Sequence, residues 1–287
     1  MKLFKFIVII LLLAIGKNSA QKLDYEFLPS GLNFMPLKAN IQEARLGILY
    51  FPENGHLTVD VGNSIDLFAL DFDSLNRLTF GIEFMAYASS TNFQDRRLQI
   101  DAIDGMFGGN VASRRSSGNS NFLMRFRIIH NSAHLVDGSY DNNSGGWSGG
   151  QNPIPFTQDY GELIAAHELL LKFGNLKYYG GVTYATLTRP SNLEEWSFNA
   201  GIEINFNKII SSILRKEVNM FLASQLIYAG KPDYKLSSNN LLGIKFGNWN
   251  NKGIVLYLSY FYGNNKFNEF YYQRVSQFGI GFIIDYF

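Results

Sequence analysis

The segment His130-Asn131-Ser132-Ala133-His134 holds two of the four histidines of the chain, with a serine midway between them. If this segment is a β-strand, the side chains of His130, Ser132 and His134 share one face. A serine hydroxyl needs an adjacent base to become a nucleophile, and the base needs a third group to orient it. His130 and Ser132 supply the first two groups. The pattern therefore indicates ester hydrolysis, provided that neighbouring elements bring an acid to His130.

Two acids are candidates for the orienting group. Asp159 lies on the next expected strand with the matching side-chain parity, and Asp137 lies in the loop between the two strands. Backbone N–H groups or a bound cation would stabilise the oxyanion. No cofactor is expected, apart from calcium if the protein hydrolyses lipids. The candidate catalytic residues are Ser132, His130, Asp159 and Asp137, and the candidate substrate-binding residues are His134 and Asn131.

Two other interpretations of the segment remain open. His130, His134 and Asp137 could ligate a metal ion, but histidines four residues apart on a strand are separated by about 13 Å and share an ion only across a bulge. Alternatively, the polar side chains form a hydrogen-bonded cluster that caps the strand and fixes the following loop. Such polar strand ends are common in proteins without catalytic activity.

Composition narrows the class of protein. The net charge is +1 in 287 residues, which gives no electrostatic argument for nucleic-acid binding. Aromatic residues make up 15% of the chain, and there is no cysteine for a disulfide or a thiolate metal site. Beyond the N-terminus, no apolar run reaches the roughly eighteen residues of a transmembrane helix. The composition favours a protein made of strands.

The N-terminus predicts export. Lys2 and Lys5 precede an apolar run at residues 6–15, which is too short to span a membrane and typical of a signal peptide. Residues 1–20 are therefore expected to be a cleaved signal peptide, followed by a periplasmic segment at 21–42. The rest of the chain, residues 43–287, is expected to be a β-barrel in the Gram-negative outer membrane.

The barrel prediction rests on alternation. In residues 196–206 (WSFNAGIEINF), apolar and polar side chains alternate, and similar segments recur along the chain. Each is roughly ten residues or longer, the length that a tilted strand needs to cross a bilayer. Apolar faces that end in aromatic residues favour an up-and-down antiparallel transmembrane barrel over a soluble sandwich. About twelve strands are expected, at 43–51, 57–70, 78–88, 98–111, 121–134, 158–172, 175–187, 196–206, 218–229, 239–248, 253–262 and 274–287.

Topology gives the two faces of the strand that holds Ser132. An even-stranded barrel begins and ends in the periplasm, so the fifth strand, 121–134, ends at the extracellular rim before the long loop at 135–157. Arg125 and Arg127 should face the lumen, because a charge on the lipid face costs roughly 2–4 kcal/mol at mid-bilayer. By parity, His130 and Ser132 face outward, near the outer-leaflet interface.

His130-Asn131-Ser132 resembles the His-x-Ser pair that outer-membrane phospholipase A and the outer-membrane lipid A deacylases carry on an outward barrel face. Residues 278–287, which end in Phe287, also resemble the C-terminal strand that the barrel assembly machinery recognises. The resemblance implies a lipid hydrolase with Ser132 as nucleophile and His130 as base. Ala133-His134 replaces the Asn-Gly that follows the serine of the phospholipase.

A second resemblance covers much of the N-terminal half. Residues 27–47 (FLPSGLNFMPLKANIQEARLG) and 130–137 (HNSAHLVD) resemble an uncharacterised family of bacterial exported and outer-membrane proteins with a His-x-Ser-Ser-His-Leu-Gly-Asp-Glu motif. Residues 98–108 (LQIDAIDGMFG) resemble a strand of the same family. Val136 and Gly138 replace the Gly and Glu of the motif. This resemblance implies export but no particular activity.

Two functions from different classes follow. The first is a non-catalytic barrel, such as a porin or small-solute channel, because polar residues at strand ends are common. The second is an outer-leaflet lipid hydrolase that uses the His-x-Ser pair. Outer-membrane lipids and the assembly machinery are the expected partners, nucleic acid is excluded, and the oligomeric state is left open. An outward His130–Ser132 pair beside an acid favours the hydrolase, and an open lumen favours the channel.

Overall fold

The computed structural model describes residues 23–93, 97–147, 152–207, 212–213 and 215–286. The main sheet has fourteen strands, of which β1 and β12 lie outside the ring, so twelve form the barrel wall of the described chain. The wall strands are β2 (Leu46–Phe51), β3 (His56–Asp71), β4 (Asn76–Phe93), β5 (Arg97–Ser117), β6 (Ser120–Leu135), β9 (Phe156–Leu171), β10 (Gly174–Arg189), β11 (Trp196–Phe206), β13 (Lys216–Gly230), β14 (Tyr234–Phe246), β15 (Gly253–Asn264) and β16 (Arg274–Asp285). The predicted all-β fold and strand number are confirmed.

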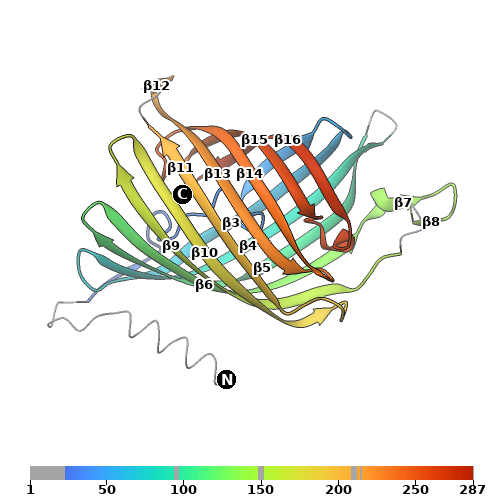
Figure 1. Ribbon diagram of the computed structural model, residues 1–287, viewed down its shortest axis with the longest axis horizontal. Helices are drawn as coiled ribbons and strands as arrows, with labels where there is room; N and C mark the ends of the chain where they lie inside the picture. Colours follow the sequence, from blue (N-terminus) through green and yellow to red (C-terminus); the bar gives the residue numbers. More distant parts are fainter. Residues whose placement is uncertain (1–22, 94–96, 148–151, 208–211, 214, 287) are drawn as a thin grey trace.

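Neighbouring strands are antiparallel, and each pairs with the next wall strand along the chain. The ring closes where β16 pairs with β2, which in turn pairs with β3. The strands are tilted across the barrel, and both chain ends of the wall lie at the end opposite the β7 and β8 ribbon (Figure 1). We call the end that carries this ribbon the long-loop end.

The two faces of the wall differ in polarity because strand side chains point alternately inward and outward. In β15, Ile254 is 50% exposed whereas Val255 is fully buried, and the same alternation runs along the strand. Aromatic side chains also stand exposed on the outside near the long-loop end, as predicted: Tyr50, Trp196, Tyr228, Tyr260 and Tyr262. The barrel therefore has an apolar outside, and its interior carries most of the buried charge.

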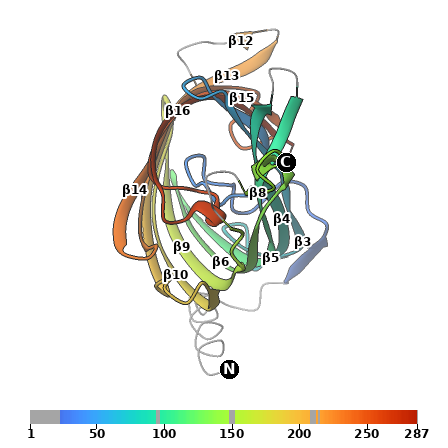
Figure 2. The ribbon, with the colours of Figure 1, turned by 90° about the vertical axis from the view of Figure 1, so that its right-hand side faces the viewer.

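The N-terminal part of the chain fills the interior. Residues 29–45, which we call the plug, run inside the barrel between β1 (Asp24–Phe27) and β2, and Figure 2 shows this blue segment within the ring. Phe34, Leu37 and Ala39 of the plug are buried against the wall. A periplasmic location is what the sequence predicts for residues 21–42. The plug lies inside the barrel instead, because its buried polar groups pair with charged groups of the lumen.

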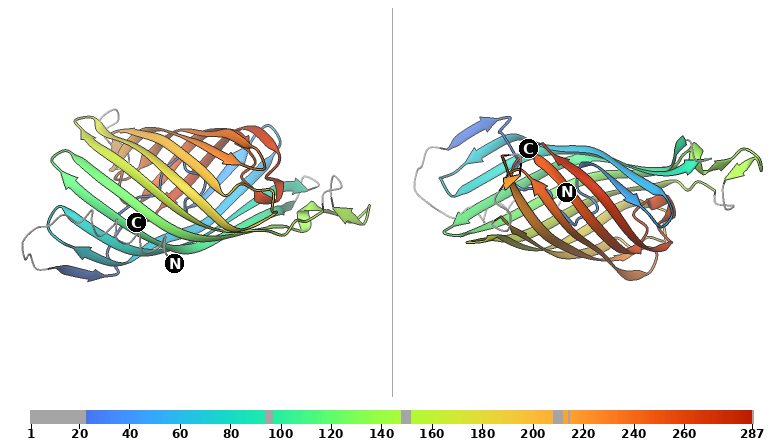
Figure 3. Two further views of the ribbon diagram at one scale, coloured as in Figure 1. Left: turned by 60° about the horizontal axis from the view of Figure 1, so that its bottom comes forward. Right: turned by 90° about the horizontal axis from the view of Figure 1, so that it is seen from above.

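Short elements complete the fold. β1 pairs with the last residues of β3 outside the ring, beside the entry of the plug. The connection from β6 to β9 contains the 3-10 turn η1 (Asp137–Ser139), β7 (Tyr140–Asp141) and β8 (Gly146–Trp147), and it projects beyond the wall (Figure 3). β12 (Ser212–Ile213) pairs with β13, and the turn η3 (Asn268–Phe270) lies between β15 and β16.

Two expectations concern residues outside this description. The expected signal peptide at 1–20 lies outside the described residues, and so does the terminal Phe287. No helix in the described part of the chain is long and apolar enough to cross a membrane.

Candidate functional site

The outward face of β6 holds the residues that the sequence singled out. Buried and exposed positions alternate along the strand, with Arg125 and Arg127 inside. His130, Ser132 and His134 occupy the opposite parity, so all three side chains point outward. They belong to the last six of the 16 residues of β6, near the long-loop end.

His130 and Asp159 form a hydrogen-bonded pair on this outward face. They are directly opposite each other in the β6–β9 register, and Nδ1 of the imidazole lies 2.6 Å from Oδ1 of the carboxylate. Their side chains are 39% and 40% exposed, and the ring of Phe107 packs 5.0 Å from the imidazole. A carboxylate on Nδ1 fixes the ring orientation and the tautomer that leaves Nε2 free to accept a proton. The structure therefore brings together the base and the orienting acid chosen from the sequence.

Ser132 stands two residues further along the same face. It pairs with Gly105 on β5 and with Thr157 on β9. A methyl group built on Gly105 would lie 3.9 Å from the Ser132 hydroxyl and would meet no other atom within 4 Å. The surface beside the hydroxyl is therefore open. In the described structure, the only side-chain hydrogen bond of His130 is the one to Asp159, and the Ser132 hydroxyl is not bonded to the imidazole.

The other predicted site residues lie apart from this pair. Asn131 is 1% exposed and points into the barrel, on the other side of the wall from Ser132. His134 faces outward opposite Ile103, and Asp137 is exposed in η1, beyond the end of the strand. Because side chains alternate along the strand, Asn131 is not on the outward surface. Asp137 lies in η1, beyond the β6–β9 pairing that holds Asp159.

A metal site does not form at this surface. In the described ranges, no cluster of three or more His, Asp or Glu side chains could hold a metal ion. This includes the set of His130, His134 and Asp137. Calcium requires six to eight oxygen ligands. Among the nearby outward side chains, the one carboxylate of Asp159 supplies too few. These residues do not fit a resident calcium ion, and we assign it no step.

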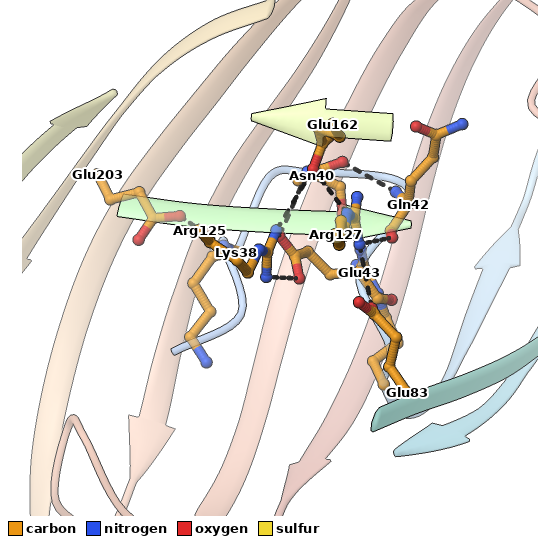
Figure 4. Close-up of polar contacts among 10 residues, drawn as sticks. Lys38, Asn40, Gln42, Glu43, Glu83, Arg125, Arg127, Glu162 and Glu203 are labelled. Carbon is orange, nitrogen blue, oxygen red and sulfur yellow. Dashed lines mark hydrogen bonds and ion pairs between the residues drawn. The ribbon is translucent and has the colours of Figure 1, made fainter. Parts of the chain in front are cut away.

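The lumen contains a second concentration of functional groups. Arg125 donates two hydrogen bonds to Glu43 of the plug, at 2.8 and 2.6 Å, and Arg127 pairs with Glu162 at 2.6 Å and Glu83 at 3.1 Å. Figure 4 shows the two arginines of β6 between the plug and these carboxylates. Burial alone would raise the pKa of Glu43, but the adjacent Arg125 outweighs it and holds the pKa at about 2.

Further ion pairs hold the plug along its length. Nζ of Lys38 lies 2.7 Å from Asp285 at the end of β16, and Lys245 pairs with the same carboxylate at 2.6 Å. The backbone N–H of Lys38 also donates to Glu203. Parity predicts lumenal positions for Arg125 and Arg127, but it gives no role to Glu43 and Lys38. Charged residues within the apolar-rich N-terminal segment were the available signal.

His167 is a further polar residue on the outer wall, at the opposite end from Ser132. Its ring stacks on Phe122 at 4.2 Å, and its Nδ1 lies 2.6 Å from the Tyr178 hydroxyl. The β6–β9 and β9–β10 registers are regular at this position. Aromatic packing and one hydrogen bond therefore accommodate the histidine without a bulge.

Comparisons with other proteins give a family for this chain but no activity. A family model described as a protein of unknown function (DUF1207) matches residues 13–286. No curated protein matches the chain.

Among solved structures, the translocator domain of autotransporter NalP from Neisseria meningitidis is 11% identical, with a TM-score of 0.38, over 87% of this chain and 91% of that one. The beta domain of the Bordetella autotransporter BrkA is 13% identical, with a TM-score of 0.40, over 84% of this chain and 99% of that one. Both likenesses are remote, and neither carries an argument about this chain.

Proposed function

The chain belongs to the family described as a protein of unknown function (DUF1207), and from its geometry we propose an outer-membrane lipid hydrolase. In this proposal, the barrel spans the outer membrane and its lumen is closed by the plug. Ser132, His130 and Asp159 hydrolyse acyl esters of lipids at the outer-leaflet interface. The hydrogen bond between His130 and Asp159, on the same outward face as Ser132, is the observation that carries the proposal.

The outer surface of the wall supports the membrane location. Leu222, Leu242 and Leu256, on three consecutive strands of the wall, are each between 46% and 49% exposed. A continuous apolar outer face with aromatic residues near its rim is the arrangement of a barrel in a bilayer. In water, such a surface would promote aggregation. His130 and Ser132 lie near the long-loop end of the wall, and in this proposal that end reaches the depth of the lipid ester groups.

The proposed reaction follows the roles of the three side chains. The Ser132 hydroxyl attacks the ester carbonyl carbon while Nε2 of His130 accepts the hydroxyl proton. The tetrahedral intermediate collapses, the C–O bond to the alcohol breaks, and His130 returns the proton to the leaving oxygen. Water then hydrolyses the acyl-serine by the same route. Asp159 accepts the Nδ1–H bond throughout and stabilises the imidazolium that forms in each step.

A solute channel is the second candidate, and one observation favours it. Cavities lie on both sides of the plug, one of them lined by Gln42 of the plug and the other by Asn33. Passage between them would require the plug to leave the lumen. That movement would break the buried Glu43–Arg125 and Lys38–Asp285 ion pairs, and breaking one buried pair costs about 3–5 kcal/mol. The hydrolase needs no such movement.

The test is fatty-acid release by the refolded barrel. Mixed detergent–phospholipid micelles and lipopolysaccharide serve as substrates, each with and without added calcium. Wild type is compared with Ser132→Ala and with the matched control Ser113→Ala, which removes a serine from the neighbouring strand β5 near the other end of the wall. We expect release that Ser132→Ala abolishes and Ser113→Ala preserves. No release from either lipid by folded wild type would refute the hydrolase. The solute channel would then be the better-supported function.

A further inference from the structure

Arg189, the last residue of β10, lies on the same outward row of the wall as Ser132. Ser132 pairs with Thr157 of β9, and Thr157 pairs in turn with Arg189. Figure 1 shows β6, β9 and β10 as neighbouring strands. Thr157 faces outward because Phe156 and Gln158 on either side of it are buried, and paired residues of antiparallel strands share a face. Arg189 therefore stands on the outer face at the long-loop end, where it is exposed.

A β-bulge in β10 gives Arg189 this direction. Thr186 pairs with Asp159 on the outward face. Arg189 comes three residues later, yet it pairs with Thr157, which is only two residues from Asp159. With uninterrupted alternation, Arg189 would instead point into the lumen. Leu187, inside the bulge, has a φ of 50°, which few non-glycine residues adopt. Bulges beside active sites often re-aim a side chain, and this one turns a guanidinium toward the side of the proposed nucleophile.

Two adjacent rows of polar side chains on this surface differ in their hydrogen bonding. His130 and Asp159 bind each other, and the Thr186 hydroxyl donates to the Asp159 carbonyl at 3.2 Å. The next row runs from Ser132 to Arg189, and none of its three side chains forms a hydrogen bond or ion pair within the described part of the chain. The first row orients the base. The second row leaves two hydroxyls and a guanidinium available to a substrate.

The guanidinium points to an anionic group on that substrate. Arginine binds phosphate oxygens through two parallel N–H donors. On the outer face of a barrel in a membrane, the phosphates of lipid headgroups are the nearest anions, and a long arginine side chain extends toward them along an apolar surface. Neighbouring strands lie about 5 Å apart, so about 10 Å separates the Cα atoms of Ser132 and Arg189 across Thr157. An extended arginine side chain covers much of this separation.

The arrangement fits lipids that carry an acyl ester and a phosphate ester on neighbouring carbon atoms. The glycerol of a phospholipid has both groups in this relation, and so does the phosphorylated glucosamine of lipid A. We propose that Arg189 binds the phosphate of a lipid whose neighbouring acyl ester is hydrolysed at Ser132. The Thr157 hydroxyl, between the two, donates to the same phosphate. This inference rests on the proposed hydrolase and names its substrate class: phosphorylated ester lipids rather than neutral glycerides.

Fatty-acid release from matched lipids tests the role of Arg189. Phosphatidylethanolamine and lipopolysaccharide carry the phosphate, whereas a diacylglycerol with the acyl chains of the phosphatidylethanolamine lacks it. Wild type is compared with Arg189→Gln, Arg189→Lys and Arg115→Gln in the same detergent micelles. Arg115 is the matched control because it pairs with the exposed Phe122 and is itself exposed on the outer face, at the opposite end of the wall.

We expect Arg189→Gln to lower kcat/KM for a phosphate-bearing lipid by about ten- to hundredfold, mainly through KM, because it removes a charged hydrogen-bond donor. Release from diacylglycerol should change by less than twofold. Arg189→Lys keeps the charge without the paired donors and should restore part of the loss. Arg115→Gln should change no rate by more than twofold. The lipid for which Arg189→Gln lowers release, phospholipid or lipopolysaccharide, identifies the source of the phosphate.

Three results would overturn the phosphate site. They are release from diacylglycerol as fast as from the phospholipid, equal losses in Arg189→Gln and Arg115→Gln, and release that Arg189→Gln leaves unchanged. The last of these would leave the hydrolase itself intact.

A binding measurement separates the phosphate site from the hydrolase. Native mass spectrometry counts the phospholipid molecules retained by the Ser132→Ala barrel, with and without Arg189→Gln. Retention that Arg189→Gln abolishes, together with no release by wild type, would refute the hydrolase and support the phosphate site. Equal retention with and without Arg189→Gln would overturn the phosphate site, whatever the rate of release.

Discussion

The most informative perturbation of the interior is Glu43→Gln. This substitution keeps the size of the side chain and removes its charge, so that the buried Arg125 guanidinium loses its principal partner. The next carboxylate oxygen, on Glu162, lies 3.6 Å away and already accepts a hydrogen bond from Arg127 at 2.6 Å. Arg125 would therefore remain charged in the lumen without full compensation. Glu43→Gln should loosen the plug.

The pKa of Glu43 gives the magnitude. The pKa falls from 4.5 to about 2 in the folded protein. Because each tenfold change in a proton-binding constant is worth about 1.4 kcal/mol, this lowering of the pKa is worth about 3 kcal/mol. Because the folded pKa is lowered, this stability is fully present above pH 4.5 and is lost as the pH falls toward 2. The loss from Glu43→Gln should be about 3 kcal/mol at pH 7 and about 1 kcal/mol at pH 3.

Urea unfolding of the barrel in lipid vesicles measures this difference. Tryptophan fluorescence is a suitable signal, because Trp249 is buried against Ala39 of the plug and Lys38 lies 5.6 Å from its ring. Glu53→Gln, in the exposed turn between β2 and β3, is the control. It should leave the free energy of unfolding unchanged at both pH 7 and pH 3. A loss that is the same at pH 7 and pH 3 would refute the electrostatic reasoning. So would a loss below 0.5 kcal/mol at pH 7.

Three further substitutions test the outer surface. Asp159→Asn should lower fatty-acid release by about 10²–10⁴-fold while the barrel stays folded, because an amide no longer holds the basic tautomer of the imidazole. Unchanged release would show that Asp159 has no part in the mechanism. Gly105→Val should block lipid access to the proposed nucleophile, whereas Gly109→Val, on the same face of β5, should leave release within twofold of wild type. Tyr178→Phe removes the hydroxyl bonded to His167 and should lower the free energy of unfolding by about 1 kcal/mol, measured by urea titration; a stabilised variant would contradict the assigned hydrogen bond.

The outward pair was predictable because strands have a period of two. Once Arg125 and Arg127 were assigned to the lumen, parity alone placed His130 and Ser132 outside. The prediction of Asp159 needed one more step, the assumption that the strands on either side of the long loop are neighbours. Antiparallel order made that assumption sound, and the register puts His130 directly opposite Asp159.

Alternation by itself determined the strands, their two faces and the ring that they form, since each strand pairs with its neighbours along the chain. The interior was decided only by the tertiary structure. The plug has no periodicity that marks it as buried, and its partners come from distant strands: Lys38 pairs with Asp285, 247 residues away. Such a pairing depends on where the closed wall brings its inward charges together. The same is true of Asn268 and Asp104, which form a hydrogen bond across 164 residues of chain.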